Sequence, residues 1–258
     1  MLHTRITLPE TGVSILTYLQ TNEACEETRR RPLVVLCPGG GYKHRVPHEG
    51  EPVALRLMTM GISVVIVEYS CEPAVFPTAL NEAAEAVAYC RAHAEEWCCQ
   101  PDHIAIMGFS AGGHLAASLG VFWQTLPYGK AGRPDAMILC YPVITSGEHR
   151  HDNSFVRLLG KDCPVKMPDV SIETHVTSDA PPAFLWHTWE DEIVPVENSL
   201  LMATALKKAG VPCEMHIYAH GPHGTALCNE ESCKAHPHDH HPENGGWIEL
   251  AARWLKNI

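Results

Sequence analysis

The strongest pointer to the fold is the stretch Ile104-Ala105-Ile106-Met107-Gly108-Phe109-Ser110-Ala111-Gly112-Gly113-His114. An apolar run leads into a Gly-x-Ser-x-Gly pattern, and a run of helical period follows it. A turn this tight forces the serine into a strained backbone conformation and requires neighbours with almost no side chain. That geometry exposes the Ser110 hydroxyl and directs the Ala111 N–H to the same point. The pattern therefore predicts a nucleophile at Ser110, with a plain glycine-rich turn as the alternative.

Short apolar runs alternate with longer helical segments along the rest of the chain. Runs that are apolar on both faces are typical of parallel strands covered by helices. We expect strands at 32–37, 62–67, 104–107, 136–140, 183–186 and 214–217, and helices at 51–60, 79–97, 113–123, 196–209 and 247–256. This alternation predicts an α/β fold with an open, mostly parallel central sheet flanked by helices. The stretches 5–8 and 14–19 predict an antiparallel hairpin at the edge of that sheet.

Composition limits the class of protein. The chain has 258 residues, which suits a single domain over 1–258, and its 19 Lys and Arg against 30 Asp and Glu leave a net charge of −11. A negative field repels phosphate backbones and anionic lipid, so we expect neither nucleic acid nor membrane as a partner. No signal peptide or membrane span is evident, and the 11 cysteines lack regular spacing. These features predict a cytoplasmic protein with reduced thiols.

A glycine-rich stretch, Pro38-Gly39-Gly40-Gly41-Tyr42, follows the first predicted parallel strand. Glycines let backbone N–H groups approach a ligand with no Cβ in the way. A tetrahedral intermediate needs such donors about 3 Å from its oxygen. We therefore expect Gly40 and Gly41, together with Ala111, to form an oxyanion hole. A flexible turn is the alternative, while a phosphate loop is disfavoured because the Lys-Ser/Thr ending is missing.

An acidic loop follows the strand predicted at 183–186. It contains Glu190, Asp191 and Glu192 and leads into Val194-Pro195. Spacing to that dipeptide favours Asp191 as the carboxylate of a catalytic triad, with Glu190 next and a solvated acidic loop as the alternative.

A histidine loop follows the next strand. His223 is held between Gly221-Pro222 and Gly224, at a strand end from which it could reach a neighbouring site. Imidazole, with a pKa near 6.5, can take the serine proton and return it to a leaving group. His220 is the closest rival, and we expect His114 to support the serine turn from behind.

The order Ser110, Asp191, His223 along the chain is the order of the α/β-hydrolase fold. At this point the chain resembles the α/β-hydrolase esterases related to hormone-sensitive lipase, and more closely a branch of acetyl esterases that act on acetylated sugars and xylan. The matching segments are 37–42, 67–70, 108–115, 141–145, 180–184, 191–199 and 221–224. The resemblance implies a nucleophile at Ser110, an acid at Asp191, a base at His223 and an oxyanion hole at Gly40, Gly41 and Ala111.

The chain departs from the lipase-like relatives in two ways. Pro38 stands where they carry a histidine, and the helical N-terminal cap is missing. The second departure predicts no large cap domain, an open site and short acyl groups. Possible walls of the substrate pocket are the aromatic residues near strand ends, namely Tyr42, Tyr69, Phe76 and Trp189.

The expected activity is hydrolysis of short-chain esters, acetyl esters above all, through an acyl-enzyme and without a cofactor or metal. Acetylated sugars and xylo-oligosaccharides are the candidate substrates, and a homo-oligomer is left open. The alternatives are a peptidase or amidase of the same fold, an arylformamidase, and a catalytically inactive binding protein.

Two regions break the alternation of strands and helices. Residues 146–180 are polar and predict an insertion above the sheet, and residues 228–241 form a loop rich in cysteine and histidine. Zinc or nickel binding is one interpretation of the loop, because thiolate and imidazole suit these ions. Its candidate ligands are Cys228, Cys233, His236, His238, His240 and His241. Their spacing matches no standard closed site, and a solvated loop is the alternative.

Overall fold

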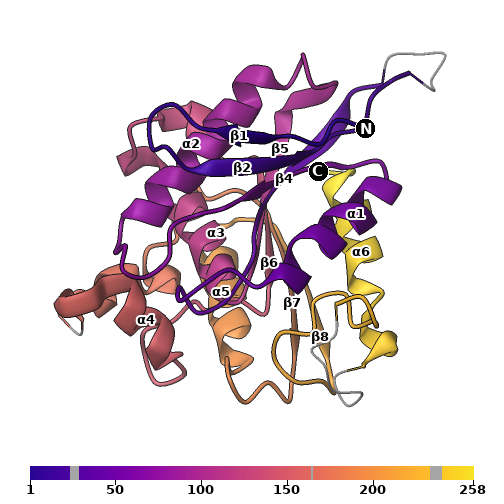
Figure 1. The fold of residues 1–258 in the computed structure, drawn as a ribbon. Helices are drawn as coiled ribbons and strands as arrows, with labels where there is room; N and C mark the ends of the chain where they lie inside the picture. The colour runs from indigo at the N-terminus through magenta and orange to yellow at the C-terminus, as the bar shows by residue number, and fades with distance from the viewer. Residues whose placement is uncertain (24–28, 164, 233–239) are drawn as a thin grey trace.

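The computed structural model describes residues 1–23, 29–163, 165–232 and 240–258 (Figure 1). Within these ranges, eight strands form one sheet in the order β1-β2-β4-β3-β5-β6-β7-β8. Their bounds are β1 (Arg5–Thr7), β2 (Ser14–Tyr18), β3 (Arg31–Cys37), β4 (Ser63–Val67), β5 (Cys99–Phe109), β6 (Ala136–Cys140), β7 (Ala183–Thr188) and β8 (Cys213–Tyr218). The pairs β1–β2 and β2–β4 are antiparallel, and the other neighbours pair in parallel. The predicted α/β fold and edge hairpin are therefore confirmed.

Helices cover both faces of the sheet. They are α1 (Glu51–Thr59), α2 (Thr78–His93), α3 (Ala111–Phe122), α4 (Asp152–Leu159), α5 (Glu197–Ala209) and α6 (Trp247–Leu255). Strand β3 supplies both cores, since Leu33 and Val35 face one cluster while Val34 and Leu36 face the other. The first cluster packs against α2, α3 and α5, and the second against α1 and α6. Figure 1 shows α1 and α6 together on one side of the strands.

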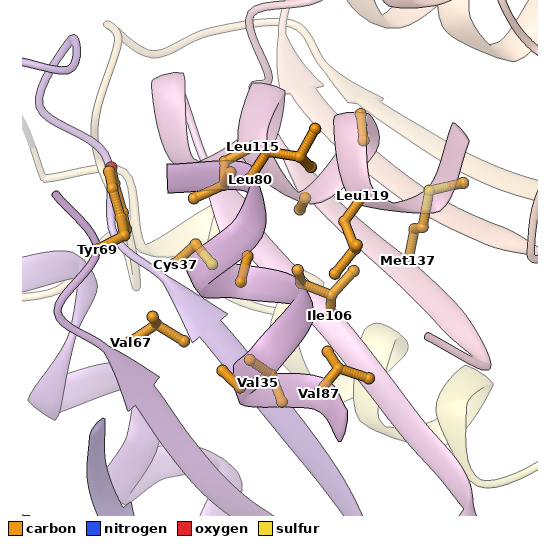
Figure 2. Close-up of a cluster of buried hydrophobic side chains, with 14 of the residues drawn as sticks. Val35, Cys37, Val67, Tyr69, Leu80, Val87, Ile106, Leu115, Leu119 and Met137 are labelled. Atoms are coloured by element: carbon orange, nitrogen blue, oxygen red, sulfur yellow. The ribbon is translucent and has the colours of Figure 1, made fainter. Parts of the chain in front are cut away.

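The larger core lies between the sheet and helices α2 and α3. Val35 and Ile106 from neighbouring strands meet Val87 of α2 and Leu119 of α3, and all four side chains are inaccessible to solvent. Figure 2 shows this cluster, in which strand side chains point at the two helices. This packing fixes α3, and with it the turn at Ser110, against the centre of the sheet.

Two element boundaries differ from the sequence prediction by four or more residues. Strand β5 begins at Cys99, five residues earlier than expected, because Cys99 pairs with Arg31 across a register shift in front of the regular ladder. The polar residues 100–103 hide this extension from an analysis of apolar runs. Helix α2 ends at His93, before the expected residue 97, and Cys98 then takes a left-handed φ of 54°.

The polar insertion at 146–180 contains a helix that its composition conceals. Helix α4 buries Phe155, Leu158 and Leu159 in the larger core and exposes its opposite face. In the cysteine- and histidine-rich loop, Cys228 is buried, whereas Cys233, His236 and His238 lie outside the described residues. None of the helices in the described ranges has the length and apolar character needed to span a bilayer.

A buried carboxylate attaches the edge hairpin to helix α2. Glu85 is only 3% exposed, and its two oxygens accept the backbone N–H groups of Glu10 and Thr11, each at 2.8 Å. These residues form the turn between β1 and β2, so the contact fixes the antiparallel edge of the sheet to the helix layer.

We predict that Glu85→Gln lowers the free energy of unfolding by about 1–3 kcal/mol, because an NH2 donor replaces one of the two accepting oxygens and leaves the N–H group opposite it unpaired. Urea denaturation followed by circular dichroism measures the change. Glu96→Gln, at an exposed position just beyond α2, is the matched control. Equal stability of the two variants would contradict the role given to Glu85.

Candidate active site

The turn between β5 and α3 holds Ser110 in a strained conformation, with φ 53° and ψ −117°. The neighbouring glycines are sterically required. A Cβ on Gly108 would lie 2.0 Å from the Gly112 carbonyl oxygen, and one on Gly112 would lie 2.1 Å from the Cys37 carbonyl oxygen. The first glycine of the Gly-x-Ser-x-Gly pattern therefore lets the turn close on itself, and the second lets it pack directly on the end of β3.

The structure brings Ser110, His223 and Asp191 into one hydrogen-bonded row. The Ser110 Oγ lies 2.8 Å from His223 Nε2, and His223 Nδ1 lies 2.6 Å from Asp191 Oδ2. The Ser110 hydroxyl can donate to Nε2 while the Nδ1–H donates to the carboxylate. The rival His220 instead meets the other candidate acid, since its Nδ1 lies 2.9 Å from Glu190 Oε1 on the exposed side of the loop.

Asp191 is 4% exposed and is hydrogen bonded through both carboxylate oxygens. Its Oδ1 accepts the N–H groups of Ile193 at 3.0 Å and Val194 at 2.9 Å. Burial acts to raise the pKa of the Asp191 carboxyl, but the hydrogen bonds from His187 and His223 outweigh burial, and the pKa lies well below its ordinary value. Asp191 is therefore a carboxylate at neutral pH.

A cavity of about 310 Å³ opens beside the Ser110 hydroxyl. It is lined by Gly40, Gly41, His44, Val46, Glu49, Ser110, His151, Arg157, Ile193, His223 and Gly224. Gly40 and Gly41 have φ values of 125° and 63°, and within the described ranges their N–H groups have no hydrogen-bond acceptor. Ala111 is the first residue of α3, where a backbone N–H lacks an intrahelical partner. The three predicted oxyanion donors thus lie beside Ser110 with their N–H groups unused.

The four aromatic residues predicted as pocket walls do not line this cavity. Tyr42 and Tyr69 are buried in the larger core, and Phe76 packs against its edge. Trp189 is 62% exposed on the surface. Three of the four aromatic residues therefore pack in or against the core, and most residues that line the cavity are polar or glycine.

Glu49 is a site residue that the sequence analysis missed. It is 2% exposed, its Oε2 accepts the Gly39 N–H at 2.6 Å, and its Oε1 accepts the Tyr141 hydroxyl at 2.8 Å. The Tyr141 oxygen in turn accepts the Ala226 N–H at 3.1 Å. Glu49 thereby connects the glycine loop to the segment that follows His223. No sequence signal distinguishes Glu49 from Glu51 two residues later. The two differ in the structure, where Glu49 is buried and Glu51 is exposed.

Two basic side chains from the insertion also reach the cavity. Arg157 of α4 donates to the Gly41 carbonyl oxygen at 3.3 Å and faces Glu72 at 3.7 Å. His151 precedes α4, and burial, followed by the nearby His223 and Arg157, lowers the pKa of its imidazole. The insertion therefore contributes side chains to the same cavity as Ser110. Within the described part of the chain, no group of three or more His, Cys, Asp or Glu side chains could hold a metal ion.

His114 lies behind the serine turn, where the sequence analysis expected it. Its Nδ1 accepts the Tyr42 hydroxyl at 2.9 Å, and its Nε2–H donates to the Val170 carbonyl oxygen at 2.9 Å. It therefore ties α3 both to the glycine loop and to the insertion. Burial lowers the pKa of His114 to about 4.

Comparisons with known proteins give two family matches: BD-FAE over residues 19–127 and the prolyl oligopeptidase family over residues 78–237. The crystal structure of an acetyl ester-xyloside bifunctional hydrolase from Caldicellulosiruptor lactoaceticus is 36% identical, with a TM-score of 0.86, and the match covers 99% of this chain and 96% of that one.

Two curated relatives are much longer than the matched region. Acetylxylan esterase of Xylanibacter ruminicola is 33% identical over 198 residues, which cover 74% of this chain and 40% of that protein. Endo-1,4-beta-xylanase B of Butyrivibrio fibrisolvens is 34% identical over 213 residues, which cover 78% of this chain and 34% of that protein. The matches thus span 34% to 40% of the length of these two relatives.

The pKa of His114 predicts a pH dependence of stability. The unfolded chain takes up a proton at this histidine near pH 6.5, whereas the folded chain does so only near pH 4. Stability is therefore lost as the pH falls from about 6.5 towards 4, by about 3 kcal/mol from this residue. We expect His114→Gln to show a shallower loss over that range in urea denaturation. The exposed His220→Gln serves as the control and should follow the unsubstituted protein; a His114→Gln profile parallel to it would contradict the assignment.

Proposed function

We propose that this chain, which belongs to the α/β-hydrolase superfamily together with the prolyl oligopeptidase family and the acetyl esterases compared above, hydrolyses carboxylic esters. The resemblance found in the sequence is confirmed by these matches. The observation that carries the proposal is the row of Ser110, His223 and Asp191 beside unused backbone N–H groups. A hydroxyl, an imidazole and a carboxylate in this arrangement activate a serine for attack on an acyl carbon.

The reaction proceeds through an acyl-enzyme. His223 Nε2 takes the Ser110 proton as the oxygen attacks the ester carbonyl, and Asp191 holds the imidazole in the required tautomer and stabilises its charged form. The N–H groups of Gly40, Gly41 and Ala111 stabilise the oxyanion of the tetrahedral intermediate. His223 then protonates the leaving alcohol. Water, activated in the same way, releases the acid and regenerates Ser110.

Short acyl esters of polyhydroxylated alcohols fit the site best. The cavity of about 310 Å³ leaves little room for a long acyl chain. His44, His151 and Arg157 provide N–H donors along its wall, which suit the hydroxyl oxygens of a sugar. One matched protein is named an acetylxylan esterase, and another is named an acetyl ester-xyloside bifunctional hydrolase. Acetylated sugars or xylo-oligosaccharides are therefore the substrates that we propose.

Amide hydrolysis is the second candidate. The prolyl oligopeptidase family matches residues 78–237, which include all three members of the triad, and the same groups can cleave amides.

Replacement of the nucleophile tests the proposal. We expect Ser110→Ala to lower kcat for p-nitrophenyl acetate by about 10⁶-fold, while thermal unfolding shows an intact fold. Ser118→Ala, a buried serine on the same helix, controls for the loss of a hydroxyl and should retain activity. Hydrolysis by Ser110→Ala at more than a tenth of the unsubstituted rate would retire the proposal.

A substrate series tests the proposed class. Because the cavity is small, we expect kcat/KM to fall at least about tenfold from C2 to C8 p-nitrophenyl esters, in line with the cost of several unaccommodated methylenes. Acetylated xylo-oligosaccharides should release acetate, measured by chromatography. Aminoacyl p-nitroanilides should be slower than acetyl esters; the reverse order would favour the amidase instead.

A further inference from the structure

A second histidine contacts the same oxygen of the triad carboxylate as His223. His187 lies on β7, and its side chain is inaccessible to solvent. Its Nε2 is 3.2 Å from Asp191 Oδ2 and 2.9 Å from the Val194 carbonyl oxygen. Its Nδ1 is 2.8 Å from the Ser199 hydroxyl, which is also buried. The mechanism above does not use this imidazole.

The partners of His187 determine its tautomer. The Val194 carbonyl can only accept a hydrogen bond, so Nε2 must carry the proton. The Ser199 hydroxyl can then donate to the unprotonated Nδ1, and a neutral imidazole satisfies both ends. The single Nε2–H is therefore shared between the Val194 carbonyl and the Asp191 carboxylate.

We propose that His187 is a positioning residue that orients Asp191 and limits how strongly it attracts His223. The inference rests on the proposed function, because it assigns a role within the same triad. Two N–H groups fix Oδ1 of Asp191, and His187 contacts Oδ2, the oxygen that accepts from His223. The carboxylate is thereby prevented from rotating away from the catalytic imidazole.

The shared Oδ2 has an electrostatic consequence. A donor on that oxygen withdraws electron density from the bond to His223, so it weakens the stabilisation of the His223 imidazolium. Loss of the donor should raise the pH at which His223 becomes protonated and inactive. The Tyr141 ring after β6 and Ser110 after β5 contact His223, and His151 before α4 interacts with it electrostatically. The other charged or titratable side chains in the same cavity wall are His44, Glu49 and Arg157. All six are left unchanged in the test.

A matched pair of amide substitutions separates the two ends of the ring. The Asn side chain in His187→Asn reaches about as far as Nδ1, so it can keep the Ser199 contact but loses Asp191. The Gln side chain in His187→Gln reaches about as far as Nε2, so its amide N–H can still donate to Asp191. The measurement is the pH profile of kcat/KM and kcat for p-nitrophenyl acetate, together with the melting temperature of each variant.

In the Asn variant we expect the acid limb of kcat/KM to move up by about half a pH unit and kcat to fall about tenfold. The Gln variant should keep the acid limb near its original pH and recover part of kcat. If both variants lose activity equally with an unmoved acid limb, or lose none, His187 only supports the fold and the proposal is wrong.

A measurement on the unsubstituted protein tests the proposal even if both variants fail to fold. Nitrogen-15 NMR of the histidine side chains should show His187 neutral and protonated at Nε2 across neutral pH. A proton on Nδ1 would leave Nε2 unable to donate to Asp191 and would overturn the proposal. This readout needs no turnover, so it is distinct from a failure of the proposed esterase activity, which the Ser110→Ala comparison reports.

Discussion

Everything in the candidate site depends on two hydrogen bonds made by one imidazole. His223 joins Ser110 to Asp191 although these residues follow three different strands, β8, β5 and β7. Parallel strands make this possible, because their carboxyl ends meet at one edge of the sheet. The glycine loop after β3 reaches the same edge. The order of the strands therefore brings the catalytic groups together, and each loop needs to supply only one or two of them.

Buried carboxylates hold several loops against the sheet and its helices. Glu49 accepts the Gly39 N–H, Glu82 accepts the Ser70 N–H at 2.6 Å, and Glu85 accepts two N–H groups of the hairpin turn. Backbone amides in loops lack the partners that strands and helices provide, and an unpaired buried N–H is costly. A charged acceptor makes a stronger bond than a neutral one. Some of the acidic residues that give the chain its negative charge are thus buried and hold loops in place.

Elements could be predicted from the sequence where steric limits allow only one local structure for the residues present. The serine turn could be predicted because only glycine fits beside Ser110, and β3 and β6 because their residues are apolar on both faces. Helix α4 escaped prediction because its polar face dominates a polar segment, although its apolar face is fully buried. Glu49 and His187 escaped for a different reason. Their partners are set by tertiary contacts between segments, and neither residue type nor spacing reveals such contacts.

The bond from Arg157 to the Gly41 carbonyl bears on how this scaffold could be re-engineered. Through this bond the 146–180 segment is attached to the glycine-rich loop that lines the cavity, so it cannot be exchanged as an independent lid. A chimaera that receives this segment from a homologue would therefore also replace the Arg157 side chain that supports the loop of Gly40 and Gly41. Swaps intended to broaden selectivity would therefore alter turnover unless the donor segment brings its own guanidinium to the same carbonyl.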